Sequence, residues 1–385
     1  MLVNEFKLKG TKAQFERIDE AIRTCQFIRN KALRFWQDNK DSNPRWIELS
    51  RQCKVWAKEF EWCKKLNSMA RQASAERAWL SINRFFKKLG KFPKFKNNNH
   101  SVEYKTTGWK LSKEINKITF TDGFMIGTLK LIGTRDLMHY TREQIKRVIL
   151  LKRADGYYAQ FVIKYERKEK QEKNGKEIGI DVGLESFLTD SNGKKAENPR
   201  YLRKTEIKLK RFQRQLSKKK KGSNNRKKAI KILGIVHLKV SRQRKDHAIQ
   251  LACKLCFSNE KIYLEDLKIK NMVKNYKLSK SINDAGWRIF RNWLEYFGKV
   301  FDRKVIVVPP HYTSQKCSSR GEIVKKSLSQ RTHKCPHCGF IADRDKNAAL
   351  NILKIGQDMP ELTLREKKSS VCLAPAKRIR HASLN

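Results

Sequence analysis

The apolar positions of the first hundred residues repeat mainly at helical spacing. Residues 2–9 alternate weakly between apolar and polar side chains, which indicates a strand. From Phe15 to Phe35 the apolar side chains recur every three or four residues, and stretches near 46–64 and 67–88 do the same. Gly90 and Pro93 then interrupt the pattern. The sequence therefore predicts a strand followed by three helices.

From about residue 100 to 168 the pattern changes to short segments rich in β-branched and aromatic side chains. The segments "NKITFTD", "TLKLIG", "IKRVILLK" and "YYAQFVIKYE" are typical of strands. Asp155 and Gly156, between the last two, are a hairpin signal. We expect the polar stretch 167–177 that follows to be a linker or an exposed loop.

Residues 178–356 combine short apolar strands with amphipathic helices. One strand ends at Asp181 and is followed by a second at 187–189 and the turn "DSNG"; another ends at Glu265 and Asp266. Basic helices are expected over 201–245, joined at Gly222, and a further helix at 238–257. Helical spacing returns at 287–301, a strand stops at Pro309, and a last helix begins within 342–356. Residues 357–385 show little periodicity and are expected to form a loosely ordered tail.

The net charge points to a polyanionic partner. The chain has 88 Lys and Arg against 38 Asp and Glu, a formal charge of +50. Nucleic acid fits this excess better than an anionic membrane surface, because 8 Trp, 10 Tyr and 19 Phe accompany the charges and can stack on bases. The N-terminus has no signal-peptide pattern and no run of 18 apolar residues occurs, so we expect a cytoplasmic, nucleoid-associated protein whose 9 cysteines are reduced.

The charge is densest between residues 201 and 245, where 18 Lys and Arg face the single acid Glu206. A pair of solvated helices without a ligand is the simpler interpretation, but so uneven a balance favours contact with phosphates. We expect nucleic-acid contacts from Lys218, Lys219, Lys220, Lys221, Arg226, Lys227 and Lys228.

Three carboxylates lie at the ends or starts of predicted elements. Asp181 and Glu265 end strands, and Asp345 begins a helix. Converging carboxylates of this kind can hold two Mg²⁺ or Mn²⁺ ions for phosphodiester hydrolysis. Each also has a simpler interpretation: a turn acid, an exposed strand end, or a helix N-cap.

A cysteine cluster at 311–340 has the spacing of a zinc site with one ligand replaced. Cys317 is followed after 17 residues by Cys335 and Cys338, but Arg320 stands where a C-x₂-C pair needs its second cysteine. The fourth ligand is left open: His333 is the best candidate, followed by His337 and His311, or a water molecule, and a zinc-free loop is the alternative. Buried thiols are the simpler interpretation of the remaining cysteines at apolar helical positions: Cys25, Cys53, Cys63, Cys253 and Cys256.

In order, the segments "GIDVGLESFLTDSNG", "KIYLEDLKIKNM" and "CPHCGFIADRDKNAALNIL" resemble the three-part RuvC-like signature of the TnpB family. These proteins are encoded in insertion sequences and are relatives of type V CRISPR effectors. "FIRNKALRFW", "GKFPKFK", "QRQLSKKKKGSNNRKKA" and "TSQKCSSRGEIVKKSLSQRTHKC" are similar to family text as well, so the resemblance covers residues 1–356.

The resemblance implies an RNA-guided endonuclease that cuts double-stranded DNA beside a short target-adjacent motif. Its guide RNA would come from the end of the transposable element. The acidic triad would be Asp181, Glu265 and Asp345, with Asp343 in a supporting position, and Mg²⁺ or Mn²⁺ as cofactor. The family has four cysteines in its zinc module, so Arg320 implies weaker zinc binding here.

The resemblance also implies an α+β multidomain fold. Residues 1–12 and 100–168 would form a β-barrel-like wedge domain, with a helical recognition domain inserted at 13–99. Residues 177–310 and 341–356 would form an RNase H-like (RuvC) α/β domain that includes the basic helices, with a zinc-ribbon-like module inserted at 311–340.

Two alternative functions stay open. One is a nuclease-inactive, guide-directed DNA-binding protein or repressor of the same ancestry, which Arg320 favours as a sign of decay. The other is a DNA-transposing enzyme.

Overall fold

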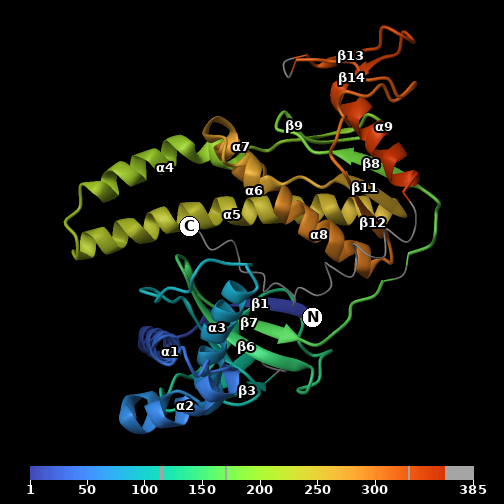
Figure 1. Cartoon of the computed structure of the whole chain (residues 1–385). Helices are drawn as coiled ribbons and strands as arrows, with labels where there is room; N and C mark the ends of the chain where they lie inside the picture. The colour runs from blue at the N-terminus through green and yellow to red at the C-terminus, as the bar shows by residue number, and fades with distance from the viewer. Residues whose placement is uncertain (113–115, 170, 328–329, 360–385) are drawn as a thin grey trace. The chain divides into compact units, whose positions relative to one another are not determined.

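The computed structural model describes residues 1–112, 116–169, 171–327 and 330–359. The chain forms two compact units, Met1–Glu166 and the part that begins at Arg167 (Figure 1). The tail predicted at 357–385 lies outside the described residues from position 360 onward. Within the described ranges, none of the helices combines the length and apolar character that crossing a bilayer requires.

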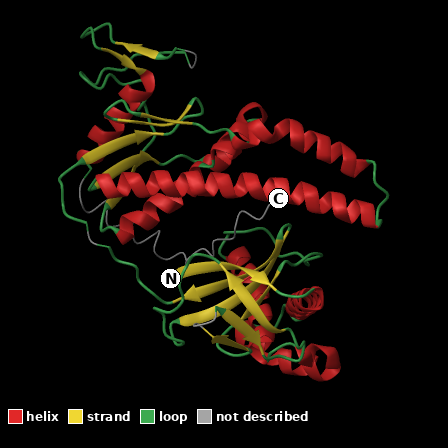
Figure 2. Ribbon diagram, turned by 180° about the vertical axis from the view of Figure 1, so that it is seen from behind, coloured by secondary structure: helices red, strands yellow, loops and turns green. Residues whose placement is uncertain are grey.

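The first unit contains one seven-stranded antiparallel sheet, which is curled (Figure 2). Its strands are β1 (Leu2–Lys9), β2 (Ser101–Tyr104), β3 (Trp109–Ser112), β4 (Lys117–Phe120), β5 (Gly127–Ile132), β6 (Ile145–Arg153) and β7 (Gly156–Ile163). The order is β2-β6-β7-β1-β5-β4-β3, so β1 lies at the centre, between β7 and β5. In the described part of the unit the edge strands β2 and β3 each pair with one neighbour, so the expected barrel-like domain is an open half-barrel.

Three helices lie between β1 and β2, where the apolar repeats predict them. They are α1 (Lys12–Asp38), α2 (Trp46–Glu59) and α3 (Ser68–Phe86). The predicted helix at 46–64 is corrected in one respect: α2 ends at Glu59, and a separate 3-10 turn covers Glu61–Lys65. Thr11 caps α1 in a reciprocal pair with Gln14. One apolar core joins helices and sheet, with Ile18 and Leu33 of α1 in the same cluster as Phe161 of β7.

The second unit is built on a mixed five-stranded sheet of order β10-β9-β8-β11-β12. The strands are β8 (Glu177–Asp181), β9 (Ser186–Asp190), β10 (Lys195–Glu197), β11 (Lys261–Glu265) and β12 (Lys304–Val308). β8, β11 and β12 run parallel, whereas β9 and β10 are antiparallel to their neighbours. The carboxyl ends of β8 and β11 therefore meet at one edge of the sheet.

Helices cover both faces of this sheet. The helices of this unit are α4 (Tyr201–Ser217), α5 (Asn224–Ser258), α6 (Ile269–Met272), α7 (Tyr276–Ala285), α8 (Trp287–Val300) and α9 (Arg344–Gln357). Of these, α5 and α8 pack on one face of the sheet and α9 on the other. Ile180 and Leu264 face a core shared with α5 and α8, while Tyr263 and Ile306 face α9 through Ile352. Alternate strand residues point to opposite faces, so Asp181 and Glu265 project on the α9 side.

Helix α9 lies unusually close to the sheet. A Cβ atom added at Gly179 of β8 would come within 2.1 Å of the carbonyl oxygen of Ala349 on α9. A Cβ added at Gly356 would come within 2.0 Å of a ring carbon of Tyr263 on β11. Both positions therefore require glycine because backbone and side chain approach too closely for any other residue.

Helices α4 and α5 run side by side as a long arm (Figures 1 and 2). The expected separate helix at 238–257 is wrong: α5 is one continuous helix of 35 residues. Asp284 of α7 anchors the arm, because its carboxylate accepts hydrogen bonds from the backbone N–H of Leu202 (2.9 Å) and of Arg203 (3.2 Å) at the start of α4. It also pairs with Arg244 of α5 at 2.7 Å. One buried side chain thus caps α4 and joins three helices.

Candidate active site and metal module

The structure places the three predicted carboxylates at one edge of the sheet, although among the described residues their oxygens do not all lie within 4.8 Å of one another. Ile180 of β8 is opposite Leu264 of β11, so Asp181 and Glu265 are the next residues at the same edge. Asp345 lies in the first turn of α9, on the face toward which both side chains project. The charges of Glu265 and Asp345 both act on the Asp181 carboxyl.

Two of the three carboxyl groups at this site have raised pKa values. Burial, followed by the charges of Glu265 and Asp345, raises the pKa of Asp181 from 3.8 to about 8. Burial also raises the pKa of Glu265, although the hydroxyl of Thr313 donates a hydrogen bond to its carboxylate and opposes the rise. Two clustered carboxyl groups with raised pKa values are typical of a site that gains stability when cations bind.

Asp343 and Asp345 have different local surroundings at the start of α9. Asp343 is the N-cap of α9: it accepts hydrogen bonds from the backbone N–H of Asp345 (3.0 Å) and Lys346 (3.2 Å), and it pairs with Lys195 at 2.8 Å. Burial opposes ionisation of Asp343, but Lys195 and the two amides outweigh it and lower its pKa. The alternative that Asp345 is the N-cap is therefore wrong. Its carboxylate instead lies beside Arg344 (3.2 Å) and Arg331 (3.9 Å).

Two asparagines of α9 hold the segment that leads into the cysteine module. Asn347 donates to the carbonyl of Lys316 (2.8 Å) and accepts from the N–H of Ser318 (2.9 Å). Asn351 donates to the carbonyls of Thr313 (2.8 Å) and Lys316 (2.7 Å). The predicted site residues do not include these asparagines; their spacing of four residues on one helix face is the signal that the sequence offers for them.

The cysteine module contains two equivalent turns. The carbonyl of Cys317 accepts from the N–H of Gly321 (2.7 Å), and the carbonyl of Cys335 accepts from the N–H of Gly339 (3.1 Å). Both glycines have positive φ, +85° and +72°. In the second turn Cys338 directly precedes the glycine, and in the first turn Arg320 occupies that place. The Arg320 side chain is exposed, and its guanidinium lies 3.4 Å from the carbonyl of His337.

Three sulfurs and one imidazole gather between these turns. A ligand atom of each of Cys317, His333 and Cys335 lies within 4.8 Å of the other two. The Sγ atom of Cys338 is 3.6 Å from that of Cys317. His333 lies on β13 (Thr332–Lys334), which pairs with β14 (Ile341–Asp343) immediately before α9. Of the three candidate histidines, His333 is fully buried, whereas His311 and His337 are exposed.

The predicted phosphate-binding residues lie at the tip of the α4–α5 arm. Lys218, Lys219, Lys220 and Lys221 are all exposed in the turn between the two helices, and Lys227 and Lys228 are exposed in the first turns of α5. Arg226 differs, because its guanidinium donates to the carbonyls of Leu216 and Lys219, each at 3.0 Å. It therefore closes the turn that presents the lysines.

The other cysteines and the aromatic helix belong to the cores. Burial raises the pKa of the Cys53 and Cys256 thiols to about 12 and that of Cys63 to about 11. Cys25 is buried and Cys253 partly buried. In α8, Trp287, Phe290 and Phe297 are buried, so the helix predicted at 287–301 packs into the core. Cys372 lies outside the described residues.

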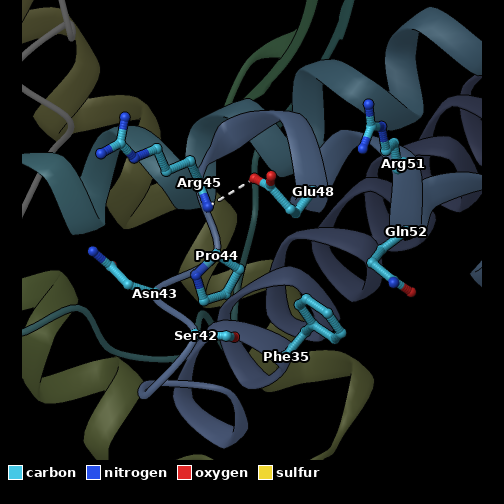
Figure 3. A pocket seen from close by; sticks show the side chains of 8 residues that line it. All are labelled: Phe35, Ser42, Asn43, Pro44, Arg45, Glu48, Arg51 and Gln52. Atoms are coloured by element: carbon cyan, nitrogen blue, oxygen red, sulfur yellow. Dashed lines mark hydrogen bonds between the residues drawn. The ribbon is translucent and has the colours of Figure 1, made fainter.

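A separate surface hollow of about 460 Å³ lies in the first unit, between the end of α1 and the start of α2 (Figure 3). Among its lining residues, Glu48 accepts a hydrogen bond from the backbone N–H of Arg45 at 2.9 Å. The hollow is lined by Phe35, Ser42, Asn43, Pro44, Arg45, Glu48, Arg51 and Gln52. None of these is a predicted site residue.

Two family models match consecutive parts of the chain. Residues 160–276 match the OrfB_IS605 family, described as "Probable transposase", and these residues include Asp181 and Glu265. Residues 287–352 match the "Cas12f1-like, TNB domain" family and include the cysteines of the module and Asp345.

Curated relatives match over most of the chain. A Streptomyces pristinaespiralis protein named as an RNA-guided DNA endonuclease is 28% identical over 368 residues, which is 91% of this chain and 88% of the relative. The InsQ protein of Escherichia coli K12, named in the same way, is 28% identical over 354 residues, 86% of each chain. A mimivirus protein named TnpB-like is 27% identical over 213 residues, 52% of this chain and 41% of the relative.

The fold also has a counterpart among solved structures. The chain aligns with a protein of a Cas12f1–sgRNA–target DNA complex with a TM-score of 0.56 and 15% identity, covering 88% of this chain and 82% of the other. At that identity the match concerns the fold, a mixed α+β arrangement. The two family models and the curated relatives agree with this likeness: the chain is similar to proteins named RNA-guided DNA endonuclease and TnpB-like.

Proposed function

We propose that this protein is an RNA-guided DNA endonuclease of transposon origin that hydrolyses phosphodiester bonds in double-stranded DNA. The observation that carries the proposal is the convergence of Asp181, Glu265 and Asp345 from two parallel strands and one helix. Guide RNA and target DNA as partners follow from the names of the relatives, and the charge of +50 is suited to both.

Asp181, Glu265 and Asp345 would hold Mg²⁺ or Mn²⁺ in this function. Oxygen donors without sulfur or imidazole suit these hard ions, and bound cations would offset the burial and the like charges that raise the pKa of Asp181. Two bound ions would supply activation of water and stabilisation of the leaving oxygen. The protein's own contribution is to fix the acids: Thr313 orients Glu265, and Asp343 with Lys195 fixes the start of α9.

Residues outside the acidic site would bind the nucleic acids. Lys218, Lys219, Lys220, Lys221, Lys227 and Lys228 are exposed on an arm, which suits contact with phosphates of guide or target, and Arg226 would support them. We further propose that the half-barrel at 1–12 and 100–168 and the helices at 13–99 act as wedge and recognition domains. The part from 177 to 356 would act as the nuclease with its inserted module.

The test is guide-dependent cleavage. The protein is copurified with RNA from its own locus, the guide segment is reprogrammed, and a plasmid carrying the matched target is incubated with Mg²⁺. We expect cleavage of matched plasmid alone, and none with Asp181→Ala. Guide-dependent binding without cleavage by the wild type would identify the nuclease-inactive alternative. Cleavage that ignores the guide, or that survives Asp181→Ala, would overturn the proposal.

A further inference from the structure

The cysteine module has an arginine at the turn position where its second turn has a cysteine. The two turns share the same backbone hydrogen bonds: the N–H of Cys317 donates to Glu322 (2.8 Å), as that of Cys335 donates to Phe340 (2.9 Å). Arg320 therefore occupies in the first turn the position that Cys338 occupies in the second. A zinc ion held by the three remaining cysteines needs a fourth ligand, since structural zinc sites are four-coordinate.

We propose that His333 is this fourth ligand, so that the module holds zinc through Cys317, His333, Cys335 and Cys338. A ring nitrogen of His333 lies within 4.8 Å of the sulfurs of Cys317 and Cys335. The side chain is 0% exposed. Within the described part of the chain, its Nε2 atom is buried and makes no hydrogen bond, so it lacks the partner that a buried polar atom requires.

The sulfur geometry fits a tetrahedral ion. Two thiolates bound to one zinc at about 2.3 Å stand about 3.8 Å apart. The Sγ atoms of Cys317 and Cys338 are 3.6 Å apart, and both cysteines are free rather than disulfide-bonded. Each donor also has a rigid origin, because the cysteines lie on hydrogen-bonded turns and His333 lies on the paired strand β13.

Lys326 is the cation that lies next to the proposed zinc site. Its ammonium contacts Nδ1 of His333, the ring nitrogen opposite the unpartnered Nε2. A second cation in this place would repel the ammonium. Removing the ammonium is therefore expected to favour zinc, which is the opposite of what loss of a ligand would do.

The experiment measures zinc on the full-length protein, purified from zinc-limited medium, loaded with one equivalent and titrated with a chelator. We expect one zinc per chain in the wild type and a loss of affinity of at least about tenfold in His333→Ala, because loss of an outer-shell partner alone costs about that much. His337→Ala is the matched control: it removes an exposed imidazole from the same module and should leave affinity unchanged. Lys326→Ala should bind zinc as well as or better than the wild type.

Cobalt substitution identifies the ligands independently of affinity. The Co²⁺ form of the wild type should show the absorption of three thiolates and one imidazole in a tetrahedral site. His333→Cys should shift it to the four-thiolate spectrum, and so should Arg320→Cys combined with His333→Ala, which also guards against a folding defect. Equal zinc affinity and an identical cobalt spectrum in wild type and His333→Ala would overturn the proposal, as would a wild type that binds no zinc. Asp181→Ala should bind zinc normally, so the result is independent of the nuclease proposal.

Discussion

Replacing Asp181 by asparagine tests whether the ionised Asp181 carboxylate lowers the free energy of unfolding. Burial and the neighbouring carboxylates raise the pKa of this group from 3.8 to about 8. In the unfolded chain the carboxyl loses its proton near pH 3.8, whereas in the folded chain it keeps the proton up to about pH 8. Between these values the unfolded state binds fewer protons, so the free energy of unfolding falls as the pH rises.

The size of this effect follows from the interval between the two pKa values. One group contributes about 1.4 kcal/mol per pH unit, so the interval from 3.8 to about 8 sets an upper limit of about 6 kcal/mol. Asparagine has nearly the same shape and no charge to bury. We therefore expect Asp181→Asn to be as stable as the wild type near pH 4 and more stable by at least about 2 kcal/mol at pH 8.

Hydrogen exchange followed by mass spectrometry measures this locally, on peptides that contain β8 and β11, without added Mg²⁺. Asp343→Asn is the matched control, because it is the same substitution at the same edge of the sheet. The pKa of Asp343 is lowered, since Lys195 and two backbone amides outweigh burial. Peptides of the Asp343→Asn variant should therefore be less protected from hydrogen exchange at pH 8 than those of the wild type. Reduced protection of Asp181→Asn at pH 8, or a pH dependence equal to that of the wild type, would refute the reasoning.

Three further predictions concern the same unit. Below about pH 8, Mg²⁺ must displace the proton of Asp181 in order to bind. The Mg²⁺ concentration for half-maximal cleavage should therefore rise about tenfold per pH unit as the pH falls from 8 to 6. A Mg²⁺ concentration that does not change with pH would contradict this. Asp284→Ala leaves Arg244 without its buried partner and α4 without its cap, and should cost about 3–5 kcal/mol, measured as faster proteolysis within 201–245, with Asp284→Asn intermediate. Neutralising Lys218, Lys219, Lys220 and Lys221 together should weaken DNA binding evenly across sequences and reduce the slope of log K against log salt by up to about 3–4; an unchanged slope would exclude phosphate contacts.

The strands that carry Asp181 and Glu265 could be predicted because short apolar runs end at these acids. Their convergence could not be derived from the runs, since it depends on which strands become parallel neighbours 84 residues apart in the chain. That information came from the order of the three motifs, which resembles the RuvC-like signature of the TnpB family. Long amphipathic patterns were similarly reliable, as in α1 and α8.

The bounds of two predicted helices were wrong because local sequence patterns compete with tertiary packing. Gly222 correctly marks the turn before α5, but α5 then continues through Gly234 to Ser258, because tertiary contacts compensate for one unfavourable residue. The 46–64 pattern is helical throughout, yet the chain breaks at Phe60, which packs against Phe27 and Trp62. The roles of Thr313, Asn347 and Asn351 could not be predicted, because their partners are backbone groups and a carboxylate far away in the sequence. The four-residue spacing of the two asparagines indicates a shared helix face but not the groups that they bind.

The two glycines between α9 and the sheet determine how the acidic site can fail. Gly179 lies directly against Ala349, and Gly356 lies directly against the ring of Tyr263. Helix α9 therefore has no room to shift or tilt against β8 and β11. The close contact of α9 with the two strands therefore restricts movement of Asp345 relative to Asp181 and Glu265. Heating should leave the site geometry intact until the sheet melts, so that thermal inactivation and unfolding of this unit occur as a single event.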